Sequence, residues 1–255
     1  MELVITTSRL FNAMGCAGHA HRAWVVASTY AAHRQAFGQP IANFVVVQET
    51  LAWMRSDAVA CLAGTLTLAD VHERVDAGTA TDQQRAFHRV GVNLNKLRTA
   101  IVAHECVNRG IEILGGNGAI ESFSVLPRLL RDNVVYENWE GTHNVLRAQV
   151  LRDCARFGVH EGFFAELKAR LPGDHDALHA DLLALRQLLA GPADLAALAF
   201  RRLADRMATW VQLAGMAGVP ELSTATTMTR RHIAEVVLDD AYVKLLASYQ
   251  RAPLP

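Results

Sequence analysis

Three stretches with helical apolar spacing, residues 7–33, 44–76 and 82–114, constrain the fold more than any other feature of this sequence. Apolar side chains recur there every three or four residues, which is the period of an α-helix. Each stretch exceeds 25 residues, whereas the average globular helix has about 11–12. Thr7 or Ser8 could cap the first one. Long apolar-faced helices joined by short turns must pack on each other, so we predict an all-α, up-and-down helical bundle.

Turn-forming residues delimit these helices. Gly38 and Pro40 break the chain after the first, Thr81 is placed to cap the third, and Gly115 and Gly116 end it. The segment from Gly115 onward, G-G-N-G, is the most glycine-dense part of the chain. Glycine permits close approach of the backbone to a ligand or to another chain, although a plain turn would also explain it.

The rest of the chain carries shorter helical patterns and no convincing strand. Pro127 starts a helix over 128–135, and another begins after Thr142 and ends near Gly158. Beyond that point we predict Ala- and Leu-rich helices over residues 160–171, 175–190, 194–216 and 222–249, with fraying at 252–255. We therefore divide the chain at Gly158 into a bundle, residues 1–157, and a C-terminal helical extension, residues 158–255.

Composition argues against nucleic-acid and membrane partners. The chain has 25 basic and 25 acidic residues, and residues 158–255 carry ten and eleven, so no net charge attracts a polyanion. No uncharged run reaches the ~18 residues of a membrane helix, and no signal-peptide pattern follows Met1. Apolar surroundings and the lack of C-x-x-C spacing indicate reduced core thiols in a cytoplasmic protein. These thiols are Cys16, Cys61, Cys106 and Cys154.

The stretch Tyr136–Asn144, Y-E-N-W-E-G-T-H-N, is the best candidate for chemistry. Glu140 lies between Trp139 and Gly141, and Thr142 is a plausible N-cap of the next helix. The dipole of that helix favours the carboxylate, whereas desolvation against Trp139 favours the neutral acid. If an apolar ligand closes the site, desolvation should dominate, which suits a general base working near pH 7. The alternative is a solvated loop carboxylate.

Histidines add little to this site. His175 and His179 are spaced i, i+4, but zinc needs a third ligand and no H-E-x-x-H motif is present, so we expect a surface pair and no metal site. His143 is next to Thr142 and could line the Glu140 site or lie on its rim.

Several motifs follow one another in a fixed order along the first part of the chain. They are Arg34-Gln35-Ala36-Phe37-Gly38-Gln39-Pro40-Ile41, then Gln48, Leu114-Gly115-Gly116-Asn117-Gly118, Arg131-Asp132 and Glu140-Gly141-Thr142. In this order they resemble the C-terminal helical domain of the acyl-CoA dehydrogenases, over roughly residues 7–157. The resemblance implies an FAD-dependent oxidoreductase that dehydrogenates an acyl-CoA thioester. It also implies dimers or tetramers and an electron acceptor such as an electron-transfer flavoprotein.

The resemblance further implies a role for each matched residue. Glu140 matches the base that removes the α-proton while the β-hydride goes to the flavin, and Arg9 and Gly141 match the substrate side of the site. Some relatives carry the base beside this arginine, but Thr7-Ser8-Arg9 contains no acid. FAD contacts, partly across a dimer interface, are implied for Arg34, Phe37, Gln48, Glu112, Gly115, Gly116, Thr142 and Asn144. Glycine-rich loops and helix N-termini both offer backbone N–H groups to phosphate.

Two departures from the family pattern keep other functions open. Glu112 stands where the family usually has a glutamine, and with Trp139-Glu140-Gly141 and the helical tail it looks more like the adaptive-response (AidB-type) subgroup. The family's N-terminal helical domain and β-domain have no counterpart here, so we expect a piece of a longer protein that is inactive alone, or a chain whose partner supplies them. The alternatives are a ligand-free scaffold, or a non-catalytic helical assembly or DNA-associated module that retains the fold. Because the tail is not basic, we do not transfer DNA binding to this chain.

Overall fold

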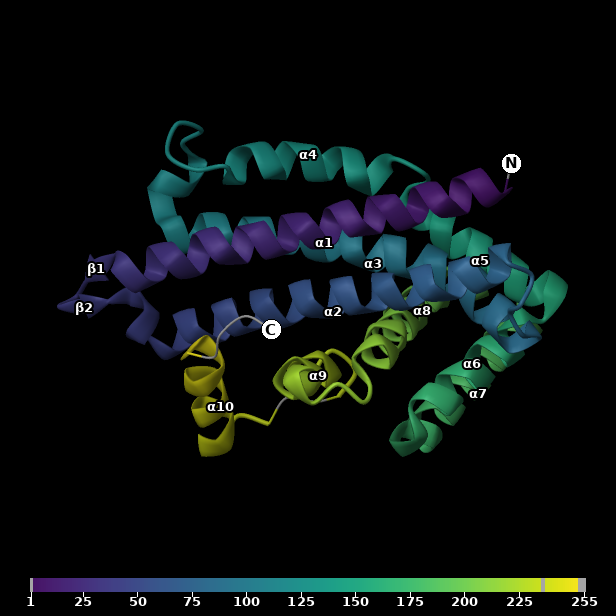
Figure 1. Ribbon diagram of the computed structural model, residues 1–255. Helices are drawn as coiled ribbons and strands as arrows, with labels where there is room; N and C mark the ends of the chain where they lie inside the picture. The colour runs from purple at the N-terminus through teal and green to yellow at the C-terminus, as the bar shows by residue number, and fades with distance from the viewer. Residues whose placement is uncertain (1, 235–236, 252–255) are drawn as a thin grey trace.

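The computed structural model describes residues 2–234 and 237–251, and this part of the chain is folded almost entirely into α-helices (Figure 1). The predicted all-α fold is therefore confirmed. The helices are α1 (Glu2–His33), α2 (Val45–Asp76), α3 (Asp82–Leu114), α4 (Leu126–Asn138), α5 (His143–Phe157), α6 (Val159–Arg170), α7 (His175–Ala190), α8 (Ala193–Met216), α9 (Ser223–Arg230) and α10 (Asp240–Arg251). Short 3-10 turns occupy Ile41–Asn43, Gly115–Ala119, Pro172–Asp174 and Pro220–Leu222.

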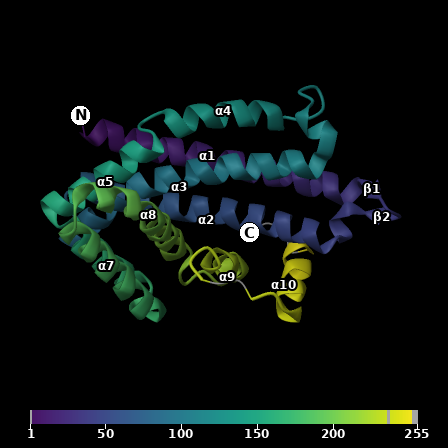
Figure 2. The same ribbon diagram turned by 180° about the vertical axis from the view of Figure 1, so that it is seen from behind.

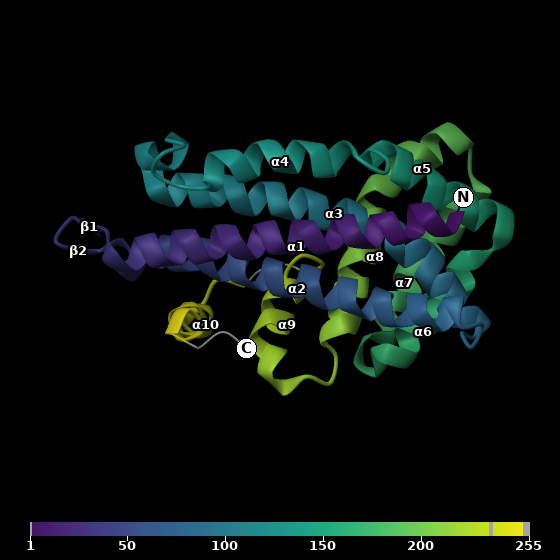
Figure 3. The same cartoon turned by 45° about the horizontal axis from the view of Figure 1, so that its top comes forward.

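The bundle consists of α1, α2, α3 and α4. These helices run side by side along the long axis, with α4 and α2 on opposite sides of the pair formed by α1 and α3 (Figures 1 and 3). Small side chains on α1 allow close helix approach: Ala17, Ala20, Ala23, Ala27 and Ala31 are buried in the cluster between these helices. At the start of α3, the Thr81 hydroxyl accepts from the third residue of the helix in a capping box, which confirms the predicted cap.

The C-terminal extension packs against the bundle rather than standing apart from it (Figure 2). One hydrophobic cluster joins Leu68 and Phe87 of the bundle to Phe163 and Trp210 of the extension. Gly158, with φ 63°, ends α5 and is followed at once by α6. The two parts thus share a core, and a domain boundary at Gly158 stays a prediction.

The first helix begins earlier than predicted. It starts at Glu2, so the cap predicted at Thr7 or Ser8 is wrong. No helix breaker precedes these residues, and the helical conformation simply continues toward the N-terminus. Both hydroxyls instead contact other elements, Thr7 reaching His72 and Ser8 reaching Glu140. The fraying predicted for 252–255 lies outside the described residues.

A small hairpin between α1 and α2 was also missed. Strands β1 (Gln35–Ala36) and β2 (Gln39–Pro40) pair in antiparallel fashion. The reversal between them uses positive φ angles, 53° at Phe37 and 84° at Gly38. Glycine adopts such angles without the steric penalty of a side chain, which explains the chain reversal at this point.

The last predicted helix, over 222–249, is wrong because the chain forms two helices there, α9 and α10. Tertiary contacts hold the turn after α9, where Arg206 donates to the Ile233 carbonyl oxygen at 2.8 Å. A new helix then starts with its own cap, since the Asp239 carboxylate accepts from the Tyr242 amide at 2.8 Å.

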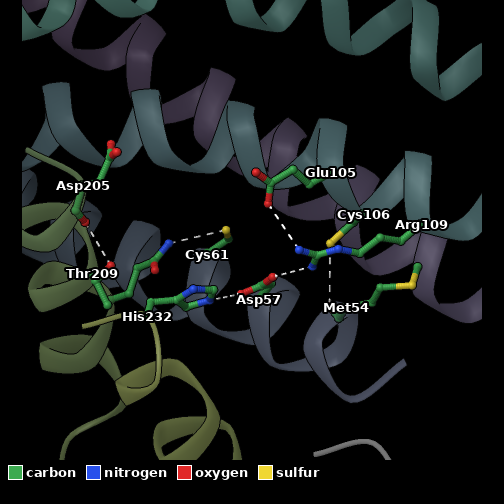
Figure 4. Close-up of polar contacts among 10 residues, drawn as sticks. Met54, Asp57, Cys61, Glu105, Cys106, Arg109, Asp205, Thr209 and His232 are labelled. Carbon is green, nitrogen blue, oxygen red and sulfur yellow. Dashed lines mark hydrogen bonds and ion pairs between the residues drawn. The ribbon is translucent and has the colours of Figure 1, made fainter. Parts of the chain in front are cut away.

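A buried carboxylate ties the extension to the bundle (Figure 4). Asp57 of α2 is buried in the core. Its oxygens lie 2.7 Å from His232 Nε2, in the turn after α9, and 3.1 Å from Arg109 Nη1 of α3. Arg109 also pairs with Glu105 at 3.5 Å. Three segments distant in sequence therefore meet at one side chain.

Three further features of the described residues concern the cysteines, membrane spans and metal ligands. The four cysteines are buried and unpaired. Within residues 2–234 and 237–251, no helix has both the length and the apolar character of a membrane span. In the same residues, no three His, Cys, Asp or Glu side chains gather where they could hold a metal ion.

Candidate functional site

The loop between α4 and α5 carries Glu140 in an unusual backbone conformation. Its φ is 59°, and that of Gly141 is 105°. For a residue with a side chain, the left-handed region costs about 1–2 kcal/mol. Such strain persists only where the surroundings hold it, and it clusters at functional sites.

Buried polar side chains from α1 and α3 hold this loop through its carbonyl oxygens. Asn12 donates to the Tyr136 carbonyl at 3.0 Å and Arg9 Nε to the Glu140 carbonyl at 3.0 Å. Lys96 Nζ donates both to Glu137, at 3.0 Å, and to Gly141, at 2.9 Å. Two of the orphan carbonyls at the end of α4, those of Tyr136 and Glu137, are thus satisfied by tertiary contacts.

The Glu140 carboxylate itself is half-buried and has a neutral partner. The Ser8 hydroxyl donates to Oε1 at 2.8 Å. The two nearby cations, Arg9 and Lys96, bond to backbone carbonyls rather than to the carboxylate. Trp139 is 55% exposed, so among the described residues this side chain does not shield the acid from solvent.

Arg9 connects the loop to the bundle interior. It is buried, and its guanidinium also donates to Asn93 Oδ1 and, at 3.0 Å, to Gln149 Oε1. Burial lowers the pKa of Arg9, while the charges of Glu140 and Asp153 act against that change. The residue is therefore a cation that bonds to three separate segments through Nε and Nη1.

A cavity of about 740 Å³ adjoins Arg9, and Glu140 does not line it. Its walls combine apolar side chains with paired polar ones: Ile5, Thr6, His72, Val75, Asp82, Arg85, Ala86, His88, Arg89, Val92, Asn93, Gln149, Phe157 and Val159. His72 and His88 lie there with their rings stacked, 5.0 Å between centroids. Burial is the main reason that the pKa of His88 falls to about 4.

An exposed apolar surface lies beside Glu140 on α4. Val134, Val135 and Trp139 are exposed and, with Asn138, line a shallow hollow of about 750 Å³.

Thr142 occupies the N-cap position of α5 as predicted, but its hydroxyl makes no capping hydrogen bond. His143 is half-buried, and burial lowers its pKa.

The residues matched to FAD contacts fall at two ends of the bundle. Thr142 and Asn144 lie beside Glu140, whereas Arg34 and Phe37 are on the hairpin at the opposite end of α1 (Figure 1). At 1.5 Å per residue, the helix from Arg9 to its end spans about 36 Å. One chain therefore does not gather these residues into a single site.

The remaining matched residues lie near the hairpin end. Gln48, in the first turn of α2, donates to the Ala42 carbonyl at 3.0 Å. Glu112 is exposed near the end of α3, and Gly115 and Gly116 follow it in an exposed turn.

Several residues of the loop framework were not anticipated from the sequence. They are Ser8, Asn12, Asn93, Lys96 and Gln149. A signal was nevertheless present in V-N-L-N-K-L, residues 92–97, where polar residues alternate with apolar ones in the middle of a helix expected to pack inside the bundle. Polar side chains in such a stretch must find buried partners.

Comparison with known proteins identifies the family. The model of the acyl-CoA dehydrogenase C-terminal domain matches residues 1–154. The chain therefore belongs to the acyl-CoA dehydrogenase family. Acyl-CoA dehydrogenase family member 11 of Caenorhabditis elegans is 33% identical over 149 residues, which cover 58% of this chain and 24% of that protein. The chain thus spans about a quarter of that relative's length.

Solved structures extend the likeness in fold beyond residue 154. Caenorhabditis elegans ACDH-11 in complex with C11-CoA has a TM-score of 0.69 at 24% identity, covering 97% of this chain and 42% of that one. An acyl-CoA dehydrogenase from Bacillus anthracis, complexed with FAD, has a TM-score of 0.71 at 19% identity, covering 98% and 52%. At these identities the likeness concerns the fold, and the extension is part of it. The AidB-type subgroup stays a prediction.

Proposed function

We propose that this chain supplies the helical part of an FAD-dependent acyl-CoA oxidoreductase in which Glu140 removes the proton α to the thioester carbonyl. The observation that carries the proposal is the conformation of Glu140, whose φ of 59° is held by buried side chains of two helices. A general base needs a fixed position within hydrogen-bond reach of its proton. Family membership supplies the substrate class, an acyl-CoA thioester.

Each group around the carboxylate has a part in this proposal. The Ser8 hydroxyl donates a hydrogen bond to Oε1 of Glu140, which leaves Oε2 to accept the α-proton of the substrate. Arg9 holds the Glu140 carbonyl and adds positive charge beside the site. The exposed apolar surface of Val134, Val135 and Trp139 would exclude water once a substrate or another domain covers it. Covering that surface would also bring the desolvation that suits a base near pH 7.

Several side chains matched to FAD contacts could donate hydrogen bonds to that cofactor. Among the described residues, the side chains of Thr142 and Asn144 near Glu140 and of Arg34 at the hairpin make no hydrogen bond, so their donors are available. Phe37, Gln48, Gly115 and Gly116 are the other residues that the family resemblance matches to FAD contacts. Glu112 fits less well, because its carboxylate would face a pyrophosphate. When bound, FAD supplies a two-electron acceptor.

Because these donors lie at two ends of the bundle, we propose that the hairpin end serves the FAD of a second copy of this chain. Phe37 is 96% exposed in this chain, and contact with a second copy would bury this apolar side chain. A homodimer or a tetramer of such dimers follows. An electron-transfer flavoprotein as acceptor and a cytoplasmic location are further parts of the proposal.

The test uses the full-length protein loaded with FAD. Acyl-CoA is mixed with it anaerobically, and bleaching of the visible flavin band is followed. We expect Glu140→Gln to slow bleaching by about 10²–10⁴-fold, while Glu161→Gln, at an exposed ion pair of the extension, leaves the rate unchanged. Bleaching of Glu140→Gln at the parent rate would refute the assignment. Steeply salt-dependent duplex binding without turnover would favour the DNA-associated alternative.

A further inference from the structure

Lys96, in the middle of α3, is a buried cation that has no carboxylate partner among the described residues. Its side chain is 0% exposed. Lysine is almost never fully buried unless it is paired, yet among the described residues Nζ donates to two backbone carbonyls. The nearby Glu137 carboxylate pairs instead with His104 Nδ1, at 2.9 Å.

The two carbonyls that Lys96 contacts lie on either side of Glu140. Glu137 is in the last turn of α4, and Gly141 is the second residue before α5. A single nitrogen atom, 3.0 Å from one carbonyl oxygen and 2.9 Å from the other, closes the intervening loop into a ring. A cation is also favoured at the C-terminal end of a helix, where the dipole is negative.

We infer that Lys96 is the positioning residue of the proposed base: it clamps both ends of the 138–140 loop and thereby fixes the direction of the Glu140 side chain. This inference rests on the proposed function of Glu140. Lys96 acts through the loop backbone and does not touch the substrate. Arg9 holds the last residue of the same loop from α1, so both α1 and α3 contact it.

The charge state of Lys96 fits this role. Burial is the main cause that lowers its pKa to about 8, and Arg9 acts in the same direction, while Cys16, Glu137 and Glu140 oppose it. Burial raises the pKa of the Cys16 thiol to about 12, so no thiolate neutralises the ammonium. Near neutral pH the clamp is charged, and hydrogen bonds from charged donors are the stronger kind.

Hydrogen–deuterium exchange tests the clamp in the chain itself. We expect Lys96→Met to speed exchange of the hydrogen-bonded amides on either side of Glu140, those of Trp139 and Leu146, by more than about tenfold, because it removes two hydrogen bonds from a charged donor. Val107→Ala, a buried change further along α3, is the control, and it should leave those two amides as in the parent. Parent-like exchange of the two amides in Lys96→Met would overturn the inference. So would equal acceleration in both variants.

A measurement on the parent keeps the inference testable if Lys96→Met does not fold. The chain contains three lysines, Lys96, Lys168 and Lys244, so ¹⁵N-lysine labelling gives three side-chain signals. One of them should titrate near pH 8, with protons that exchange slowly with water. The inference would be overturned if the three lysine signals had the same titration midpoint and the same rate of proton exchange with water.

Kinetics separates positioning from mere packing. In the full-length FAD enzyme, Lys96→Met should slow flavin bleaching at saturating acyl-CoA by about tenfold or more, with the Kd for acyl-CoA within about threefold of the parent. If Lys96→Met bleaches the flavin at the parent rate while Glu140→Gln bleaches it slowly, the role of Lys96 is refuted and that of Glu140 is not. A parent rate in Glu140→Gln would refute the proposed base, and the exchange experiment would still decide whether the clamp exists.

Discussion

Asp57→Asn should lower the free energy of unfolding by much more than the same substitution on the surface of the same helix. Asp57 is 3% exposed and receives His232 and Arg109 from two other segments (Figure 4). Asparagine has the same shape but no charge. The substitution therefore isolates the electrostatic part of the contact between the bundle and the extension.

The magnitude follows from the surroundings of each partner. Breaking a fully buried ion pair costs about 3–5 kcal/mol. Arg109 is 31% exposed and retains Glu105 at 3.5 Å, so its charge is not left uncompensated. The amide oxygen of the introduced asparagine could still accept a hydrogen bond. We therefore expect a loss of about 2–3 kcal/mol, a large fraction of the 5–15 kcal/mol typical of a folded domain.

Urea denaturation at pH 7, followed by far-UV circular dichroism, measures this loss. Asp70→Asn is the matched control on α2, because the pair between Asp70 and Arg74 is exposed and spaced i, i+4. Such pairs contribute about 0.3–0.5 kcal/mol. Combining Asp57→Asn with His232→Gln in a double-mutant cycle should give a coupling free energy of about 1 kcal/mol or more.

Lowering the pH should remove the difference between the parent and Asp57→Asn. Burial alone would raise the Asp57 pKa, but the hydrogen bond and charge of His232, with the charges of Arg98 and Arg109, bring it below 3.8. A carboxylate whose pKa is lower in the folded than in the unfolded state stabilises the fold fully when the pH is above its pKa in the unfolded chain. This stabilisation is lost as the pH falls through its pKa in the folded chain. The difference should stay constant above about pH 4 and shrink below it.

Two results would contradict an electrostatic role of Asp57. One is a loss for Asp57→Asn no larger than that for Asp70→Asn. The other is a difference from the parent that persists unchanged well below pH 4, since the carboxylate would then not be the origin of the stabilisation.

Other substitutions test local features, each through the free energy of unfolding in urea. Thr81→Ala should cost about 1 kcal/mol, because the hydroxyl caps α3. Gly118→Ala should cost about 2 kcal/mol or more, since the added Cβ would lie 2.5 Å from the backbone oxygen of Ile111, whereas Gly116→Ala meets nothing and should be near neutral. Burial lowers the pKa of His88 from 6.5 to about 4, so the parent should lose about 3 kcal/mol as the pH falls across that range, and His88→Phe should abolish that loss.

Local sequence signals predicted most of the helices well. The third long helix was expected over 82–114 and spans Asp82–Leu114, because a capping threonine precedes it and a glycine pair ends it. The position of Thr142 at the start of α5 was predicted in the same way. Periodicity and caps depend on neighbours within about four residues, and a single sequence shows these directly.

Errors arose where distant contacts outweigh local preference. The pattern of 222–249 is helical throughout, yet Arg206 holds the intervening turn from another helix. Thr7 and Ser8 looked like caps, but their hydroxyls contact side chains far along the chain. Side-chain spacing contains no information about such partners.

Local patterns in the amino-acid sequence were enough to predict a bundle of long helices and a glutamate, between tryptophan and glycine, just before a helix N-terminus. The tertiary structure decided how that glutamate is held: Arg9 and Lys96, 131 and 44 residues before it, approach from α1 and α3 and bond to its loop. Helical period follows from local backbone geometry. The pairing of a buried cation with a particular carbonyl exists only after the helices have packed.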